Sequence, residues 1–179
     1  MRNLQPQLWD IYQADHLIRA TINRTPVIES SFLSARTGRQ IFLKLECLQV
    51  TGSFKIRGAS NRILQLSRED KQRGVIAVSS GNHGRAVAYV ASKFGIPAVI
   101  CVSETVPQNK VSAIRTLGAE VLVSGKTYDQ ATEVAMQEQE ERGLTMIHPF
   151  DDPLVIAGQG TIGLELLKTI PDLDTVIVP

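Results

Sequence analysis

Short apolar runs alternate with helix-length segments through the middle of this sequence. The apolar runs predict strands at 75–78, 98–102, 120–123 and 144–147. The segments around them predict helices at 54–66, 84–94, 107–117 and 128–141. Each predicted strand follows closely on a glycine suited to a helix end, at Gly74, Gly95, Gly118 and Gly143. The strands are apolar throughout, as in strands buried on both faces. The alternation therefore predicts a three-layer α/β sandwich with a parallel sheet.

The flanking segments carry weaker patterns. The further expected elements are a helix at 8–22, a strand at 40–45, a helix at 154–169 and a strand at 175–178. The first of these helices should end before Pro26, because the residue ahead of a proline avoids the helical region.

Composition excludes several classes of function. The 179 residues are 43% hydrophobic and 21% charged, with a net charge of +1, which argues against a nucleic-acid surface. No stretch approaches the ~20 apolar residues of a membrane span, and Met1–Ile11 lacks the apolar core of a signal peptide. We expect no nucleic-acid or membrane partner and a cytoplasmic location. Cys47 and Cys101 are too few for a disulfide framework or a metal cluster, so no metal site is predicted.

The segment from Thr51 to Ser60 places a lysine at the start of a predicted helix. Ser53 is a good N-cap residue, and Lys55 follows it directly. A crowded amine at such a position has a lowered pKa and suits covalent bonding to a carbonyl group. The alternative is an ordinary surface lysine in the first turn of a helix.

A second segment, Ser79–Gly84, follows the predicted strand at 75–78 and precedes a predicted helix. Open α/β sheets bind ligands beyond the carboxyl ends of their strands, at turns of this kind. The turn offers hydroxyl, amide and imidazole groups, and backbone N–H groups at a helix N-terminus, which suit an anion. The alternative is an ordinary turn with Ser80 or Asn82 as the N-cap.

Together these segments resemble one family. The matching stretches are Arg24–Val27, Lys44–Glu46, Gly52–Ala59, Ser79–Gly84 and Ala157–Thr161. In this order and spacing they are similar to the fold-type II pyridoxal-phosphate (PLP) enzymes, and within them to the serine/threonine dehydratase and serine racemase branch. The resemblance runs from about residue 20 to the end of the chain.

A narrower resemblance, carried by Val106–Val111 and His83–Ala86, is to dehydratases of hydroxyectoine utilisation.

The resemblance implies roles for individual residues. Lys55 would bond covalently to the cofactor and, once released, remove the Cα proton of the substrate. Phe54 would lie beside the cofactor ring, and Asn82 would hydrogen-bond its ring hydroxyl. The substrate carboxylate would be held by the turn residues Ser79, Ser80, Gly81 and His83. For Phe54 and His83, structural roles in the core and at the helix start remain open.

Ser80 separates two activities. In the racemase-like members a serine at this place acts as acid or base on the second face of the cofactor, whereas many bacterial threonine dehydratases that resemble this sequence carry alanine. The main hypothesis is a dehydratase (ammonia-lyase) that converts a small β-hydroxyamino acid to a 2-keto acid and ammonia. The alternative is an amino-acid racemase of the same fold.

The resemblance also implies that this chain is the N-terminal part of such an enzyme, ending before the glycine-rich loop that holds the cofactor phosphate. We expect residues 1–53 to begin a large domain, 54–148 to form a small α/β domain, and 149–179 to return to an incomplete second domain. The chain alone is then expected to be inactive, to bind PLP weakly or not at all, and to form homo-oligomers. A third hypothesis is a catalytically silent interaction module.

Overall fold

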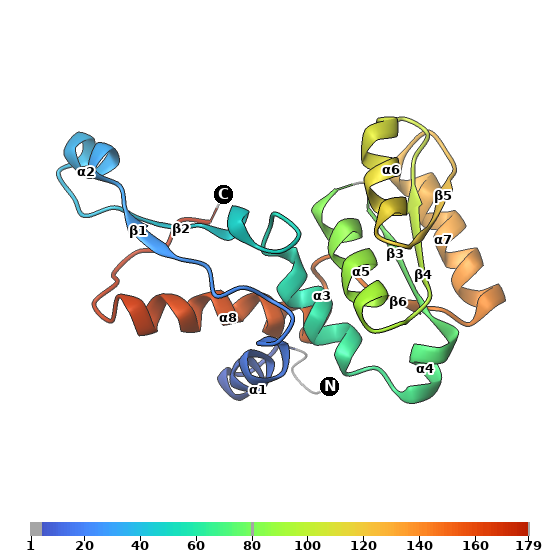
Figure 1. Ribbon diagram of the computed structural model, residues 1–179, viewed down its shortest axis with the longest axis horizontal. Helices are drawn as coiled ribbons and strands as arrows, with labels where there is room; N and C mark the ends of the chain where they lie inside the picture. The colour runs from blue at the N-terminus through green and yellow to red at the C-terminus, as the bar shows by residue number, and fades with distance from the viewer. Residues whose placement is uncertain (1–4, 80, 179) are drawn as a thin grey trace.

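A computed structural model describes residues 5–79 and 81–178, and its centre is a four-stranded parallel sheet (Figure 1). The strand order is β5-β4-β3-β6, with all three pairings parallel. The strands are β3 (Val75–Val78), β4 (Ala98–Val102), β5 (Glu120–Val123) and β6 (Thr145–Met146). Val75 of β3 aligns with Ala98 of β4 on one side and with Thr145 of β6 on the other.

Helices cover both faces of this sheet. On one face lie α5 (Asn82–Lys93) and α6 (Gln108–Thr116), and on the other lies α7 (Tyr128–Arg142). Neighbouring strand residues point to opposite faces. Ala77 therefore joins the buried cluster that includes α5, while Ile76 joins the cluster with Ala131 of α7. The predicted three-layer α/β sandwich with a parallel sheet is confirmed.

The remaining elements lie outside this sandwich, and all of them except α4 lie to one side of the sheet (Figure 1). They are α1 (Leu8–Ile18), β1 (Val27–Glu29), α2 (Ser31–Thr37), β2 (Phe42–Lys44), the 3-10 helix η1 (Glu46–Leu48), α3 (Lys55–Leu64), α4 (Arg68–Arg73) and α8 (Pro153–Thr169). β1 and β2 pair antiparallel. α8 packs against α1 and α3, and α3 also packs against α5. Figure 1 shows α3 between the sheet and α8. The domain boundaries proposed from the sequence stay a prediction.

The helices α3 and α8 touch through their backbones. A Cβ atom added to Gly158 would lie 2.6 Å from the carbonyl oxygen of Arg57 and 2.7 Å from the Cα of Gly58. A Cβ atom added to Gly58 would meet the carbonyl oxygen of Val155 at 2.8 Å. Two glycines that face each other therefore permit a crossing that any larger residue would force apart.

Two expectations from the sequence were wrong, and one helix was missed. The first helix ends at Ile18, before the predicted 22, and the chain goes on in a tighter turn in which the N–H of Thr21 donates to the carbonyl oxygen of Ile18 at 2.8 Å. The predicted strand at 175–178 pairs with no described strand over 175–178. The short helix α4 was not predicted, although Ser67 caps it through the N–H of Asp70 at 3.0 Å.

The length and apolar character of the helices decide whether any of them could cross a membrane. No helix within residues 5–79 and 81–178 is both long enough and apolar enough to cross a bilayer.

The helix crossing makes a prediction for two glycines of α8. Gly158→Ala should lower the free energy of unfolding by about 1–3 kcal/mol, because the new methyl group overpacks the contact with α3. The control is Gly163→Ala in the same helix, where an added Cβ meets no atom within 4 Å. That change should raise the free energy of unfolding by about 0.5–1 kcal/mol, because alanine favours the helix. Urea unfolding of both variants measures the difference, and equal effects would contradict a tight crossing.

Candidate active site

The ends of β3 and β6 define an edge of the sheet where ligands bind in open α/β folds. The chain leaves β3 through the 79–81 turn into α5, which leads to β4, whereas β6 lies on the opposite side of β3 and leads to α8. The order of the strands thus reverses between β3 and β6, and such reversals form crevices at the carboxyl ends of strands. The first turn of α3, with Lys55, reaches this same edge.

Lys55 is the first residue of α3 and its amine points to the segment after β6. Its Nζ donates a hydrogen bond to the carbonyl oxygen of Pro149 at 2.8 Å. The ring of Phe54 lies 5.3 Å from the same nitrogen, as in a cation–π contact. Burial lowers the pKa of Lys55, because it disfavours the charged ammonium form. Lys55 is therefore a partly buried amine that deprotonates more easily than an ordinary surface lysine.

The predicted N-cap role of Ser53 was wrong. Phe54, the residue ahead of α3, has helical dihedral angles of −63° and −15° instead of the extended conformation of a capping residue, and no side chain caps the helix. The Ser53 Oγ and Thr51 Oγ1 atoms are buried and have no hydrogen-bond partner among the described residues. Buried hydroxyl groups are normally paired, so these two mark a polar region next to Lys55 that a ligand could satisfy.

Ser79 and Gly81 lie between β3 and the N-terminus of α5. The Ser79 Oγ accepts a hydrogen bond from the N–H of Gly81 at 3.2 Å, and Asn82 begins the helix as an exposed residue. A Cβ atom at Gly84 would overlap the carbonyl oxygen of Ser79, so only glycine fits there. The first N–H groups of a helix have no partner within it and favour an anion. Ser80 lies outside the described residues.

His83 is buried at the start of α5, with 3% of its surface exposed. Its Nε2 lies 2.8 Å from the carbonyl oxygen of Ile147, and since a carbonyl only accepts, Nε2 carries the proton. Nδ1 is then a buried acceptor with no partner among the described residues. Burial lowers the pKa of His83 to about 4, against the opposing contact with Ile147, and the positive charge of Lys55 lowers it further. The imidazole is therefore neutral at neutral pH.

Lys55 and His83 meet at one place although they are far apart in the sequence. They donate to the carbonyl groups of Pro149 and Ile147, which are two residues apart in one segment. Asn82 adjoins this pair through His83, and Phe54 through Lys55. With its ring N–H already used, neutral His83 has only its backbone N–H to offer a carboxylate. The roles assigned to Phe54, Asn82, Ser79, Gly81 and His83 stay predictions.

Sequence reasoning missed the part played by the segment 147–149. A backbone carbonyl has no sequence signature, so neither acceptor could be named in advance. One signal was present, because the predicted strand at 144–147 must end at the same edge of the sheet as the strand at 75–78. The segment after it was therefore a candidate for the site.

Metal and thiol chemistry find no support in the described residues. Residues 5–79 and 81–178 contain no group of three His, Cys, Asp or Glu side chains placed to hold a metal ion. Cys47 is exposed and Cys101 is buried in β4. Burial raises the pKa of the Cys101 thiol to about 11, which keeps that thiol protonated at neutral pH.

Comparison with known proteins gives the family. Residues 18–179 match the family described as "Pyridoxal-phosphate dependent enzyme", and the chain belongs to this family. It is 49% identical over 172 residues to the L-threonine ammonia-lyase of Thermotoga maritima, a match that covers 96% of this chain and 43% of that protein. The chain spans about half the length of the curated relatives it matches.

Two solved structures are similar to the fold described above. Maize serine racemase superposes with a TM-score of 0.91 at 40% identity, covering 94% of this chain and 51% of that one. A T.th. threonine deaminase superposes with a TM-score of 0.86 at 47% identity, covering 93% of this chain and 52% of that one. The predicted family resemblance and the cofactor, pyridoxal 5'-phosphate, are confirmed.

The described residues fit the reactive part of this cofactor. Its aldehyde reacts with an unprotonated amine, and partial burial lowers the pKa of the Lys55 amine. Its polar ring substituents need hydrogen-bond partners, and the unpaired hydroxyls of Thr51 and Ser53 lie in the loop that leads to Lys55. The N-terminus of α5 offers N–H groups to an anion at the same edge.

The buried imidazole makes the protein sensitive to acid. Because the pKa of His83 is about 4 in the folded chain and 6.5 as its ordinary value, the unfolded state binds more protons between these values. The stability that His83 contributes is complete above pH 6.5 and is lost as the pH falls towards 4, by about 3 kcal/mol in total. His83→Gln keeps an N–H donor for Ile147 and does not titrate, so it should flatten this slope.

The measurement is urea unfolding at a series of pH values across that window. The control is His16→Gln, which removes an exposed imidazole on α1 and should leave the slope unchanged. A slope that His83→Gln does not alter would contradict a buried neutral imidazole.

Proposed function

We propose that the protein containing this chain is a PLP-dependent ammonia-lyase that converts a small β-hydroxyamino acid, such as threonine or serine, to a 2-keto acid and ammonia. The observation that carries the proposal is the Lys55 amine, partly buried and with a lowered pKa, at the sheet edge where β3 and β6 end. Relatives named L-threonine ammonia-lyase, at 47–49% identity, support the substrate class.

The chemistry divides between the cofactor and the residues of the chain. When bound, pyridoxal phosphate supplies an electron sink that makes the Cα proton of an amino acid acidic. Lys55 then serves as the base for that proton, and burial lowers its pKa, which favours the unprotonated amine. The ring of Phe54 lies beside this amine, with its centroid 5.3 Å from Nζ.

The turn after β3 orients the substrate in this proposal. The Ser79–Gly84 turn and the first N–H groups of α5 hold the carboxylate, because a helix N-terminus favours negative charge. Asn82 hydrogen-bonds the ring hydroxyl of the cofactor. His83 stays neutral and so places no positive charge near Lys55. A positive charge there would oppose the uptake of the Cα proton by the Lys55 amine. The β-hydroxyl leaves as water, and hydrolysis of the released product gives the 2-keto acid and ammonia.

Replacing the lysine tests the proposal directly. Lys55→Ala should lower ammonia release from threonine by at least about 100- to 10,000-fold, the range of a lost acid–base group. Borohydride reduction and peptide mass spectrometry should find the pyridoxyl group on Lys55 in the unchanged protein and nowhere in the variant. The control is Lys93→Ala, an exposed lysine that also donates to a backbone carbonyl, that of Ala20 at 2.8 Å. Equal labelling of both variants would remove Lys55 from its role.

Racemisation is a second candidate activity. The similarity to maize serine racemase and the serine at position 80 favour it. Ser80→Ala should lower the racemisation of serine at least about tenfold more than its deamination, because only racemisation needs a proton donor on the second face. Chiral chromatography and ammonia assays on the same samples give both rates. An equal loss of both would assign Ser80 to binding.

Three finer properties belong to the same proposal. The enzyme forms homo-oligomers, with exposed apolar side chains such as Trp9 and Phe32 as candidates for the contact. It works in the cytoplasm, in keeping with its ordinary composition. Its pathway is hydroxyectoine utilisation, as the Val106–Val111 stretch suggests.

A further inference from the structure

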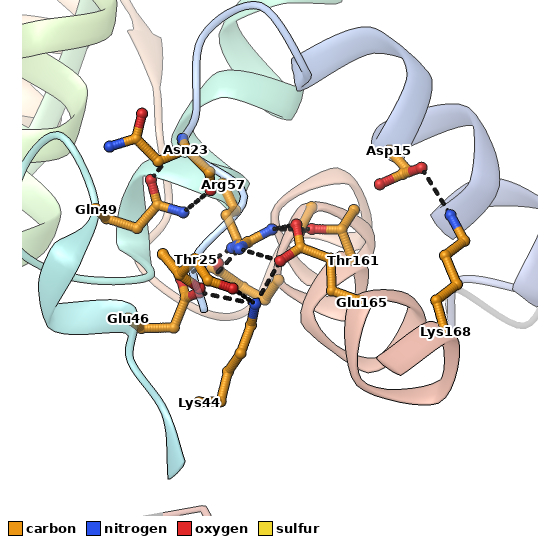
Figure 2. A network of polar contacts seen from close by, with 12 residues as sticks. Asp15, Asn23, Thr25, Lys44, Glu46, Gln49, Arg57, Thr161, Glu165 and Lys168 are labelled. Carbon is orange, nitrogen blue, oxygen red and sulfur yellow. Dashed lines mark hydrogen bonds and ion pairs between the residues drawn. The ribbon is translucent and has the colours of Figure 1, made fainter. Parts of the chain in front are cut away.

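Four charged side chains form a cluster of ion pairs (Figure 2). The charge cluster consists of Lys44 on β2, Glu46 on η1, Arg57 on α3 and Glu165 on α8. Its two positive and two negative charges balance, and at most 13% of any of the four side chains is exposed. The cluster therefore joins elements on both sides of α3 through buried ion pairs.

Arg57 is the centre of the cluster and uses all five of its N–H groups. Its Nε and Nη2 donate to the two oxygens of Glu46 at 2.9 and 2.8 Å. Its Nη1 and Nη2 donate to the two oxygens of Glu165 at 2.8 and 3.1 Å, and the remaining Nη1 proton goes to Thr161 Oγ1 at 3.0 Å. Only the planar fork of arginine can hold two carboxylates in this way.

The carboxylates are held from their other sides as well. Lys44 Nζ donates to Glu165 Oε2 at 2.5 Å and to the carbonyl oxygen of Thr25 at 2.7 Å. Thr25 Oγ1 donates to Glu46 Oε1 at 2.5 Å. Hydrogen bonds from Arg57 and Lys44 outweigh the burial of Glu165 and lower its pKa. Glu165 is thus fixed in place and ionised, and Glu46 is held by hydrogen bonds from Arg57 and Thr25.

Stability alone is a poor reason for such a cluster. Taking charges out of water costs free energy that the ion pairs only partly return, and apolar residues of similar volume often serve a core as well or better. What the cluster offers beyond an apolar contact is direction, since each hydrogen bond fixes both a distance and an angle.

This fixed geometry affects Lys55, because Lys55 lies two residues before Arg57 in the first turn of α3. Two residues correspond to about 200° around a helix, so the two side chains leave α3 on nearly opposite sides. Arg57 reaches Glu165 while Lys55 reaches the carbonyl of Pro149. The carbonyl oxygen of Arg57 also lies only 2.6 Å from the place that a Cβ atom of residue 158 would take, so this turn packs closely against α8.

We propose that the charge cluster is a positioning device for the catalytic lysine. Arg57, held by Glu46 and Glu165, fixes the first turn of α3 and thereby the place of the Lys55 amine at the sheet edge. Arg57 touches neither cofactor nor substrate in this proposal, which rests on the role of Lys55 under the proposed function.

The test compares Arg57→Lys with a control of matched stability. Arg57→Lys keeps the charge and loses the fork, so it should lower kcat for threonine deamination at least about tenfold with KM within about threefold, as a small misplacement of a reacting group does. The control is a truncation of Ile63, a fully buried residue near the other end of α3, to Val or Ala, whichever matches the Tm of Arg57→Lys. The control should leave kcat within about threefold of the unchanged protein.

A second readout does not depend on any reaction. In the cofactor-free protein at neutral pH, acetic anhydride labels unprotonated amines, and mass spectrometry gives the labelling of Lys55 relative to Lys93. Arg57→Lys should lower this ratio at least about threefold, because a displaced amine returns to solvent and to its ordinary protonation. The Ile63 control should leave it unchanged. If Arg57→Lys equals the control in this ratio at matched Tm, the inference is wrong.

Thr161→Val gives the same test if Arg57→Lys does not fold. It removes one acceptor from Nη1 and leaves every ion pair in place, so a smaller fall of the labelling ratio is expected, and no fall would overturn the inference. Failure of the proposed function would give a different result. If the unchanged protein does not deaminate threonine, but the labelling ratio still falls in Arg57→Lys and not in the Ile63 control, the activity is rejected and the positioning role is kept.

Discussion

The close crossing of α3 and α8 is the contact on which the arrangement of this chain depends. Gly58 and Gly158 bring the two backbones together, and this brings Glu165 within reach of Arg57. The same helix α3 also packs against α5, which lies on the sheet. A single short helix therefore carries the contact to α8, the charge cluster and Lys55. Any shift of α3 would move all three at once.

The sheet supplies the second constraint. Since β3 lies between β4 and β6, the turn into α5 and the segment into α8 leave the sheet side by side. Both basic groups at this edge, Lys55 and His83, have lowered pKa values with burial as the main cause. Their nearest polar partners are backbone carbonyls, which accept a hydrogen bond without adding a full negative charge. The edge therefore favours an uncharged amine.

Much of the fold could be predicted from the sequence where the signal was local. The strands at 75–78, 98–102 and 120–123 have the predicted bounds, because each is a short, largely apolar run that begins one to three residues after a glycine. The first helix was predicted too long because the chain tightens into a turn after Ile18, where the N–H of Thr21 donates to the carbonyl oxygen of Ile18. The strand expected at 175–178 failed because a strand exists only with a partner.

In the candidate site, too, features with a local sequence signal could be predicted and features that depend on distant contacts could not. A lysine at a helix start could be recognised from the Thr51–Ser60 segment, whereas the absence of a cap from Ser53 depends on the dihedral angles of Phe54. The charge cluster could not be predicted at all. Glu165 stands in an apolar helix with no motif around it, and its pairing with Arg57 follows only from the crossing of α3 and α8.

The charge cluster also pairs its two carboxylates with basic groups other than Lys55. A carboxylate beside Lys55 would raise the pKa of that amine and keep it protonated. Glu46 and Glu165 instead face Arg57 and Lys44, whose charges neutralise theirs, and burial is the cause that governs Lys55. Arg57 therefore serves α3 in two ways, because it fixes the first turn and holds the nearby negative charge on the side of the helix away from the lysine.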